Sequence, residues 1–215
     1  MTGAELHALA ARLFPIPRSI TGDGVRQSLA ILAERIALET HEIPTGTPVF
    51  DWTVPREWRL REAHITAPDG RRIADAAGHN LQLLNYSAPF RGRVGLEELR
   101  RHLFTLPDQP DLIPYRTSYY KEQWGFCLPH RLVETLPEGE YAVVVDTELF
   151  AGSLTFGELA LPGESAEEVL FSTHCCHPSL ANDNLSGMVV AMELAARLAA
   201  RQRRRLSYRF LFLPG

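Results

Sequence analysis

Residues 168–213 read EVLFSTHCCHPSLANDNLSGMVVAMELAARLAARQRRRLSYRFLFL, and this stretch decides the fold. Residues 168–173 and 206–213 are largely apolar runs of strand length, whereas residues 185–200 carry apolar side chains at helical spacing along one stripe. A strand, a helix and a second strand within about 45 residues predict a βαβ unit, whose two strands run parallel with a right-handed crossover.

The chain before this unit shows two different sequence patterns, one helical and one β-like. Its first forty residues predict two amphipathic helices, the second beginning near Asp23. Their apolar stripes are Leu6, Leu9 and Leu13, and then Val25, Leu29, Leu32 and Ile36. From Val49 to about residue 156, short β-like runs alternate with turns such as Pro68-Asp69-Gly70, a pattern typical of a compact antiparallel β subdomain. Within it we predict strands at 59–66, 81–86, 125–128 and 141–147, and a helix at 96–104.

These patterns predict an α/β fold with an insertion. Residues 1–48 and 157–215 form a discontinuous, incomplete α/β domain with a mostly parallel sheet. Residues 49–156 form an inserted, mostly antiparallel β-rich domain.

Composition excludes several classes of protein. The 215 residues carry a net charge of −4 and a pI near 6.1, so a basic nucleic-acid-binding face is not expected. No apolar run reaches the roughly 18 residues of a membrane span, and Glu5, His7 and Arg12 interrupt any signal-like N-terminus. Three cysteines do not form a disulfide framework. We therefore expect a soluble, cytoplasmic protein.

The chemistry concentrates in the loop between the predicted strand at 168–173 and the following helix. His174, Cys175, Cys176, His177 and Asp183 are all potential metal ligands. In open α/β sheets, ligands bind at the carboxyl ends of the strands. Taken singly, each residue has a structural explanation, because free cysteine behaves as a buried apolar residue and aspartate caps helices. Their occurrence together favours a metal site.

Other interpretations of these residues are possible from the sequence. The HExxH pattern of helical zinc peptidases and paired CxxC spacings are both absent. A thiol-based or structural metal site of His174, Cys175, Cys176 and His177 is a second interpretation. Elsewhere, Cys127 is predicted to be a buried, unreactive thiol. The scattered aromatic residues are predicted to be core rather than a substrate groove: Trp52, Trp58, Tyr119, Tyr120 and Trp124.

Three segments resemble one known family. The string Thr173-His-Cys-Cys-His-Pro-Ser-Leu-Ala-Asn-Asp-Asn-Leu-Ser-Gly187 and the opening Leu13-Phe-Pro-Ile-Pro-Arg-Ser-Ile-Thr-Gly-Asp-Gly-Val-Arg26 are similar to its signatures. Residues 51–58 (DWTVPREW) and 113–120 (IPYRTSYY) resemble its inserted β-rich domain. This is the aminopeptidase-like family first catalogued as a domain of unknown function. It is distantly similar to the M28-type zinc aminopeptidases, which carry Gly-Ala-x-Asp-Asn-x-Ser-Gly. The resemblance implies a partial zinc-aminopeptidase-like (phosphorylase/hydrolase-like) fold.

The resemblance also implies roles for individual residues. Asp183 matches the aspartate that bridges two metal ions in the zinc aminopeptidases, and His177 is the preferred histidine ligand. His174 is the rival ligand, because it ends the strand; otherwise it lies beside the ligands and orients them or contacts substrate. Asn182 and Asn184 are expected to shape the loop and bond the ligand carboxylate. One or two zinc ions are the expected cofactor.

The expected activity follows from the same resemblance. It is zinc-dependent hydrolysis of a peptide N-terminus or another amide, such as an acylated amino sugar. The general-base glutamate and further ligands are expected beyond Gly215, so we expect an incomplete fragment that is inactive alone. The alternative is a non-catalytic binding or scaffold protein that retains the fold. The inserted region is a candidate for substrate selection, gating or dimerisation, so a homo-oligomer is one expectation. Neither nucleic acid nor membrane is expected as a partner.

Overall fold

The computed structural model describes residues 1–214, and its chain divides into two compact units. The first unit comprises Met1–Glu57 and the chain from Ala151 onward; the second unit is Trp58–Phe150. The predicted boundaries, after residues 48 and 156, fall within β2 (Pro48–Val49) and β10 (Ser153–Leu161). Among the described residues, no helix is long and apolar enough to cross a bilayer.

A four-stranded sheet of order β1-β10-β12-β11 forms the centre of the first unit. The strands β1 (Glu39–Pro44), β11 (Glu168–His174) and β12 (Ser207–Leu213) complete it. The pairs β1/β10 and β10/β12 are antiparallel, whereas β11 and β12 are parallel. The α/β class and the βαβ unit are thus confirmed. The sheet is of mixed orientation rather than mostly parallel, because β1 and β10 add to the βαβ unit as antiparallel strands. A short hairpin joins β2 to β3 (Trp52–Thr53).

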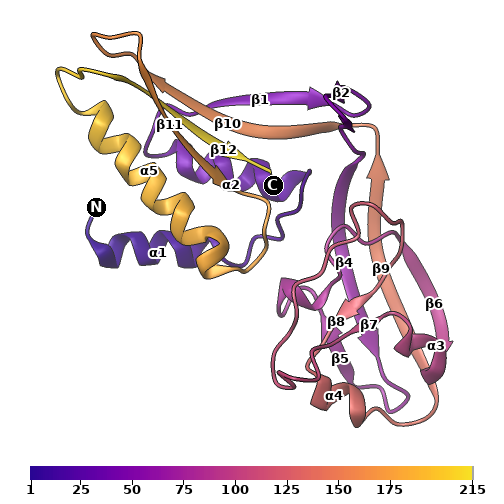
Figure 1. Cartoon of the computed structure of the whole chain (residues 1–215). Helices are drawn as coiled ribbons and strands as arrows, with labels where there is room; N and C mark the ends of the chain where they lie inside the picture. Colours follow the sequence, from indigo (N-terminus) through magenta and orange to yellow (C-terminus); the bar gives the residue numbers. More distant parts are fainter. Residues whose placement is uncertain (215) are drawn as a thin grey trace. The chain divides into compact units, whose positions relative to one another are not determined.

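Helices α1 (Gly3–Leu13), α2 (Asp23–Ala33) and α5 (Ser186–Ala199) lie along one face of this sheet (Figure 1). A capping box fixes the start of α1, in which Thr2 and Glu5 bond each other's backbone amides. One apolar core joins the three helices to the sheet. Its fully buried members include Leu13, Val25, Leu32, Met192, Phe210 and Phe212.

The second unit is built on a four-stranded sheet of order β5-β4-β9-β6. Its elements are β4 (Glu57–Thr66), β5 (Arg72–Asp75), β6 (Phe90–Gly95), α3 (Leu96–Arg100), β7 (Leu103–Phe104), β8 (Phe126–Cys127), α4 (His130–Glu134) and β9 (Glu140–Phe150). The β5/β4 and β6/β9 pairs are antiparallel, and β7 and β8 pair in parallel.

Two predictions for the second unit were wrong. Residues 81–86 do not form a strand: Asn80–Gln82 is a 3₁₀ turn, and Leu83 makes a single bridge to Phe126. The predicted helix at 96–104 stops at Arg100, because Leu103–Phe104 pairs with β8 instead. In both places, buried leucines satisfy the helix and strand patterns equally, and tertiary pairing decides between them.

Candidate metal-binding site

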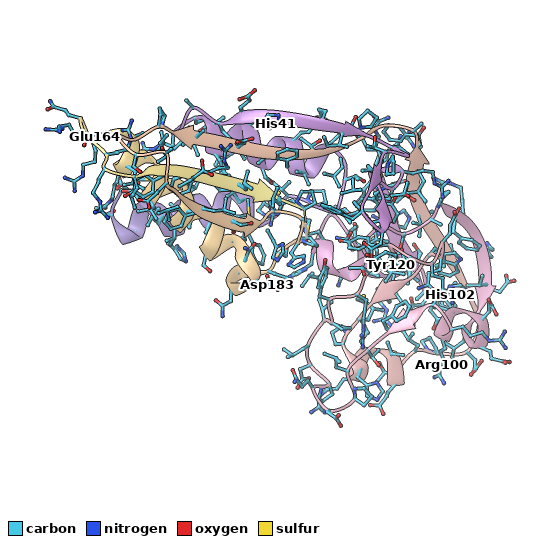
Figure 2. All side chains as sticks on the ribbon, turned by 45° about the horizontal axis from the view of Figure 1, so that its top comes forward. His41, Arg100, His102, Tyr120, Glu164 and Asp183 are labelled. Atoms are coloured by element: carbon cyan, nitrogen blue, oxygen red, sulfur yellow. The ribbon has the colours of Figure 1, made fainter. Side chains whose placement is uncertain are left out.

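The candidate site lies in the loop that leaves β11 and enters α5. The strand ends at His174, and one irregular turn, Ala181–Leu185, precedes the helix. Within this turn Asp183 has φ −119° and ψ 86°, and Asn184 has φ −151° and ψ 52°, so neither residue is helical. The peptide bond between them is cis. Figure 2 labels Asp183 at this turn, where its side chain is exposed.

His177 and Asp183 are brought together by this loop. The His177 Nδ1 atom lies 3.3 Å from Asp183 Oδ1 and 3.2 Å from the Asp183 carbonyl oxygen. A hydrogen bond with the Cys176 side chain is the largest cause that raises the pKa of His177, to about 9, and the Asp183 carboxylate adds to it. These partners favour the protonated form of the ring, and a bound metal ion would displace that proton.

The other predicted site residues have separate places. The His174 ring centroid lies 5.9 Å from that of His177. Asn182 is exposed, and its carbonyl accepts a hydrogen bond from the Ser186 hydroxyl at 3.3 Å. Among residues 1–214, no three His, Cys, Asp or Glu side chains form a group able to hold a metal ion. The described residues therefore offer one pair of candidate ligands, His177 and Asp183, rather than a complete set.

Asn184 fixes the loop to the end of β11. With its amide nitrogen donating to the His174 carbonyl at 2.6 Å, its oxygen accepts from the Thr173 hydroxyl at 2.7 Å and from the His174 amide at 3.2 Å. A Cβ atom on Gly187 would lie 3.1 Å from Thr173 Oγ1 and 3.2 Å from the side-chain amide of Asn184. Glycine therefore lets the start of α5 approach these two side chains closely. Asn184 therefore bonds the strand end and not, in these contacts, the Asp183 carboxylate.

Arg18, which holds the loop from outside it, was not predicted as a site residue from the sequence. Arg18 lies 159 residues before His177 in the chain, yet its Nε donates to the His177 carbonyl at 2.9 Å. Ser179 adds a second tie, donating from Oγ to the Phe14 carbonyl at 3.0 Å. The available signal was an arginine in the apolar run Ile16-Pro17-Arg18-Ser19-Ile20, where burial of a charge requires fixed partners.

The cysteines of the described chain are not joined in disulfides, and all of them are buried. Desolvation raises the pKa of Cys127 from 9.0 to about 12 and also raises that of Cys175.

A labelling experiment follows from this burial. At pH 8 the raised pKa leaves Cys127 with about a thousandfold less thiolate than an ordinary cysteine. We expect iodoacetamide to modify Cys127 far more slowly in the native protein than in denaturant, as measured by mass spectrometry of its peptide. Equal rates in the two states would contradict a buried, inert thiol.

The family follows from comparison with known proteins. A model described as a domain of unknown function, DUF4910, matches residues 7–215. The chain belongs to this family. It is 46% identical over 213 residues to a Clostridium acetobutylicum protein whose name proposes a polysaccharide biosynthesis protein with an aminopeptidase-like domain. That alignment covers 99% of this chain and 49% of the relative, so the chain spans about half the relative's length.

Solved structures confirm the fold of the DUF4910 chain. A Clostridium acetobutylicum crystal structure, described as that of a candidate peptidase, matches with a TM-score of 0.96 at 46% identity, over 99% of this chain and 50% of that one. The zinc aminopeptidase BSAP from Bacillus subtilis matches with a TM-score of 0.57 at 12% identity, covering 96% and 60%. A peptidase M28 precursor from Shewanella amazonensis gives 0.51 at 11%, covering 97% and 66%. The two low-identity matches bear on the fold alone.

Proposed function

We propose that this chain supplies part of the zinc site of an aminopeptidase-type hydrolase in the full-length protein. The observation that carries the proposal is the 3.3 Å separation of His177 Nδ1 and Asp183 Oδ1 beyond the carboxyl end of β11. Two donors on a tetrahedral zinc ion, each bound at 2.0–2.2 Å, are separated by about 3.3–3.6 Å, a range that includes this distance. One neutral imidazole and one carboxylate are a donor set that suits zinc.

The roles of this chain's residues follow from their positions. His177 and Asp183 would hold the ion, and Asn184 would keep their loop against the strand end. His174, with its ring beside that of His177, would contact substrate or a ligand. Zinc bound there supplies a Lewis acid and lowers the pKa of a bound water. A third ligand and a general base would come from the part of the full-length protein outside this chain.

The substrate proposed for this site is a peptide N-terminus or a related small-molecule amide. The family relationship and the aminopeptidase fold of the neighbouring structures support this substrate class. The name of the Clostridium acetobutylicum relative supports polysaccharide biosynthesis as a setting, in which an acylated amino sugar would be the amide. Assays of the full-length protein should therefore compare aminoacyl anilides with N-acyl amino sugars.

Zinc content tests the proposal directly. In the full-length protein we expect one or two zinc ions per chain by plasma mass spectrometry. We expect His177→Ala and Asp183→Ala each to weaken zinc affinity by at least about 100-fold, because loss of a ligand costs more than loss of an outer-shell contact. His7→Ala, at an exposed histidine of α1, is the matched control and should bind zinc normally.

Two outcomes would contradict the proposal. Zinc content that is unchanged in both ligand variants would exclude His177 and Asp183 as ligands. Zinc lost in Cys175→Ser and Cys176→Ser, but not in the ligand variants, would favour a thiol-based site. A folded full-length protein without zinc would instead favour a non-catalytic binding protein.

A further inference from the structure

The side chain of Arg18 is completely buried in the first unit, with 0% exposure. Its Nη1 donates to the Leu13 carbonyl at 2.5 Å and lies 3.5 Å from Ser28 Oγ, while its Nε donates to the His177 carbonyl at 2.9 Å. Ser28 Oγ in turn donates to the Gly24 carbonyl at 2.8 Å, which leaves its lone pairs directed to other donors. One guanidinium thus joins the end of α1, helix α2 and the loop of the candidate site.

Burial of this charge is costly, and the fold retains it. Desolvation lowers the pKa of Arg18 to about 10, opposed by the neighbouring thiols of Cys175 and Cys176. At neutral pH the group is therefore still charged. An ion taken out of water is tolerated only where its hydrogen-bond partners have good geometry. The planar guanidinium fork presents donors in several fixed directions, which a lysine ammonium does not.

The segment from Leu13 to Arg26 packs closely around the backbone of Arg18. A Cβ atom on Gly24 would lie 2.5 Å from the Pro17 carbonyl oxygen and 3.0 Å from Arg18 Cα, so only glycine lets the first turn of α2 pack on this segment. The Arg18 amide also donates to the Ile16 carbonyl at 2.8 Å. These contacts pack the segment that carries Arg18 closely against the start of α2.

We propose that Arg18 is a positioning residue for His177. By holding the His177 carbonyl, it fixes the backbone from which the imidazole reaches Asp183, and so sets the direction of the ligand nitrogen. The inference rests on the proposed function, because it takes His177 as a metal ligand. Functional side chains need placement to within about 0.5 Å, and outer-shell contacts typically change metal affinity by 10- to 100-fold.

The test uses the full-length protein, with zinc and cobalt as probes. For Arg18→Met we expect zinc affinity to fall by about 10- to 100-fold. The visible absorption of the cobalt form should change as well, because it reports ligand geometry. Arg18→Lys should show a smaller loss, since it keeps one donor and the charge. Leu161→Ala is the matched control: it truncates a core residue at the end of β10, which pairs with Tyr208 near the start of β12, whereas His174 pairs with Leu213 at the end of β12, so the cobalt spectrum should be unchanged.

The outcomes separate this inference from the proposed function. Wild-type protein that binds neither metal overturns both. Wild-type binding with the same affinity and cobalt spectrum in Arg18→Met overturns the positioning role alone. If Arg18→Met does not fold, Arg18→Lys decides in the same way. If neither variant folds, hydrogen exchange of the wild-type Arg18 Nε–H decides: zinc should slow it, because coupling between the sites is reciprocal, and an unchanged rate overturns the inference.

Discussion

Replacing Arg26 with Met is expected to lower the free energy of unfolding of the first unit by about 3 kcal/mol. The Arg26 guanidinium donates two hydrogen bonds to the Glu57 carboxylate, from Nη1 to Oε1 at 2.5 Å and from Nη2 to Oε2 at 2.9 Å. Glu57 is only 4% exposed. The Ser153 amide also donates to the Glu57 carboxylate, at 2.9 Å, and this contact does not depend on the arginine. A buried carboxylate that loses its cation keeps its desolvation cost but loses the ion pair that offsets most of it.

Amide hydrogen exchange in α2 and β10 measures this loss within the first unit. Arg12→Met is the matched control: Arg12 pairs with Glu34 through two bonds of 2.6 Å, but both side chains are about half exposed. Solvent screens such a pair, so this variant should change little. Arg26→Met with Glu57→Leu should recover most of the stability, because both charges are then gone. Equal effects of Arg26→Met and Arg12→Met would show that burial does not set the strength of the Arg26 pair.

The same variant carries a pH signature. The hydrogen bond from Arg26 lowers the pKa of Glu42 below 4.5. A carboxyl group with a lowered folded-state pKa stabilises the fold above its unfolded-state pKa, and that contribution is lost as the pH falls through the folded-state pKa. The wild-type protein should therefore lose stability below about pH 4.5 more steeply than Arg26→Met.

Replacing Trp58 with Ala is expected to destabilise the second unit by about 4 kcal/mol. The indole is 4% exposed, and its Nε1 donates to the Ser87 carbonyl at 2.9 Å. Its ring centroid lies 6.4 Å from that of Tyr86. Truncation leaves a cavity the size of the indole in addition to the lost transfer free energy.

Trp58→Phe separates packing from hydrogen bonding. The Ser87 carbonyl also accepts from the Thr147 hydroxyl at 2.8 Å, so loss of the indole N–H alone leaves it satisfied. We expect a cost of about 1 kcal/mol for this variant. Hydrogen exchange of the β9 amides gives both values. Wild-type exchange in Trp58→Ala would refute a core role and return Trp58 to the list of groove residues.

Local patterns in the sequence were sufficient for part of this fold. The spacing of Val25, Leu29 and Leu32 predicted α2, and the alternation of strand, helix and strand predicted β11, α5 and β12. The antiparallel half of the same sheet was not predictable, because β10 pairs with β12, and β1 with β10, across distant parts of the chain. Such pairings depend on tertiary packing, which periodicity does not encode.

The candidate site, too, could be predicted from the sequence only in part. His177 and Asp183 are six residues apart in one loop, so their proximity could be expected from the sequence. The aromatic prediction was mixed: Trp58 is core, whereas Tyr120 is 87% exposed. The role of Arg18 could not be predicted, since only the folded chain brings this residue, between α1 and α2, into contact with the loop. Long-range contacts of a buried charge leave no spacing rule in the sequence.

The strands β4 and β9, by which the chain enters and leaves the second unit, are hydrogen-bonded neighbours in one sheet. The two ends of this 93-residue segment, Trp58–Phe150, therefore lie side by side. A module of this kind can be removed, replaced or transplanted by a single exchange of coding sequence, without rethreading the host fold. Evolution can consequently vary the second unit among relatives while β11, α5 and β12 keep their register.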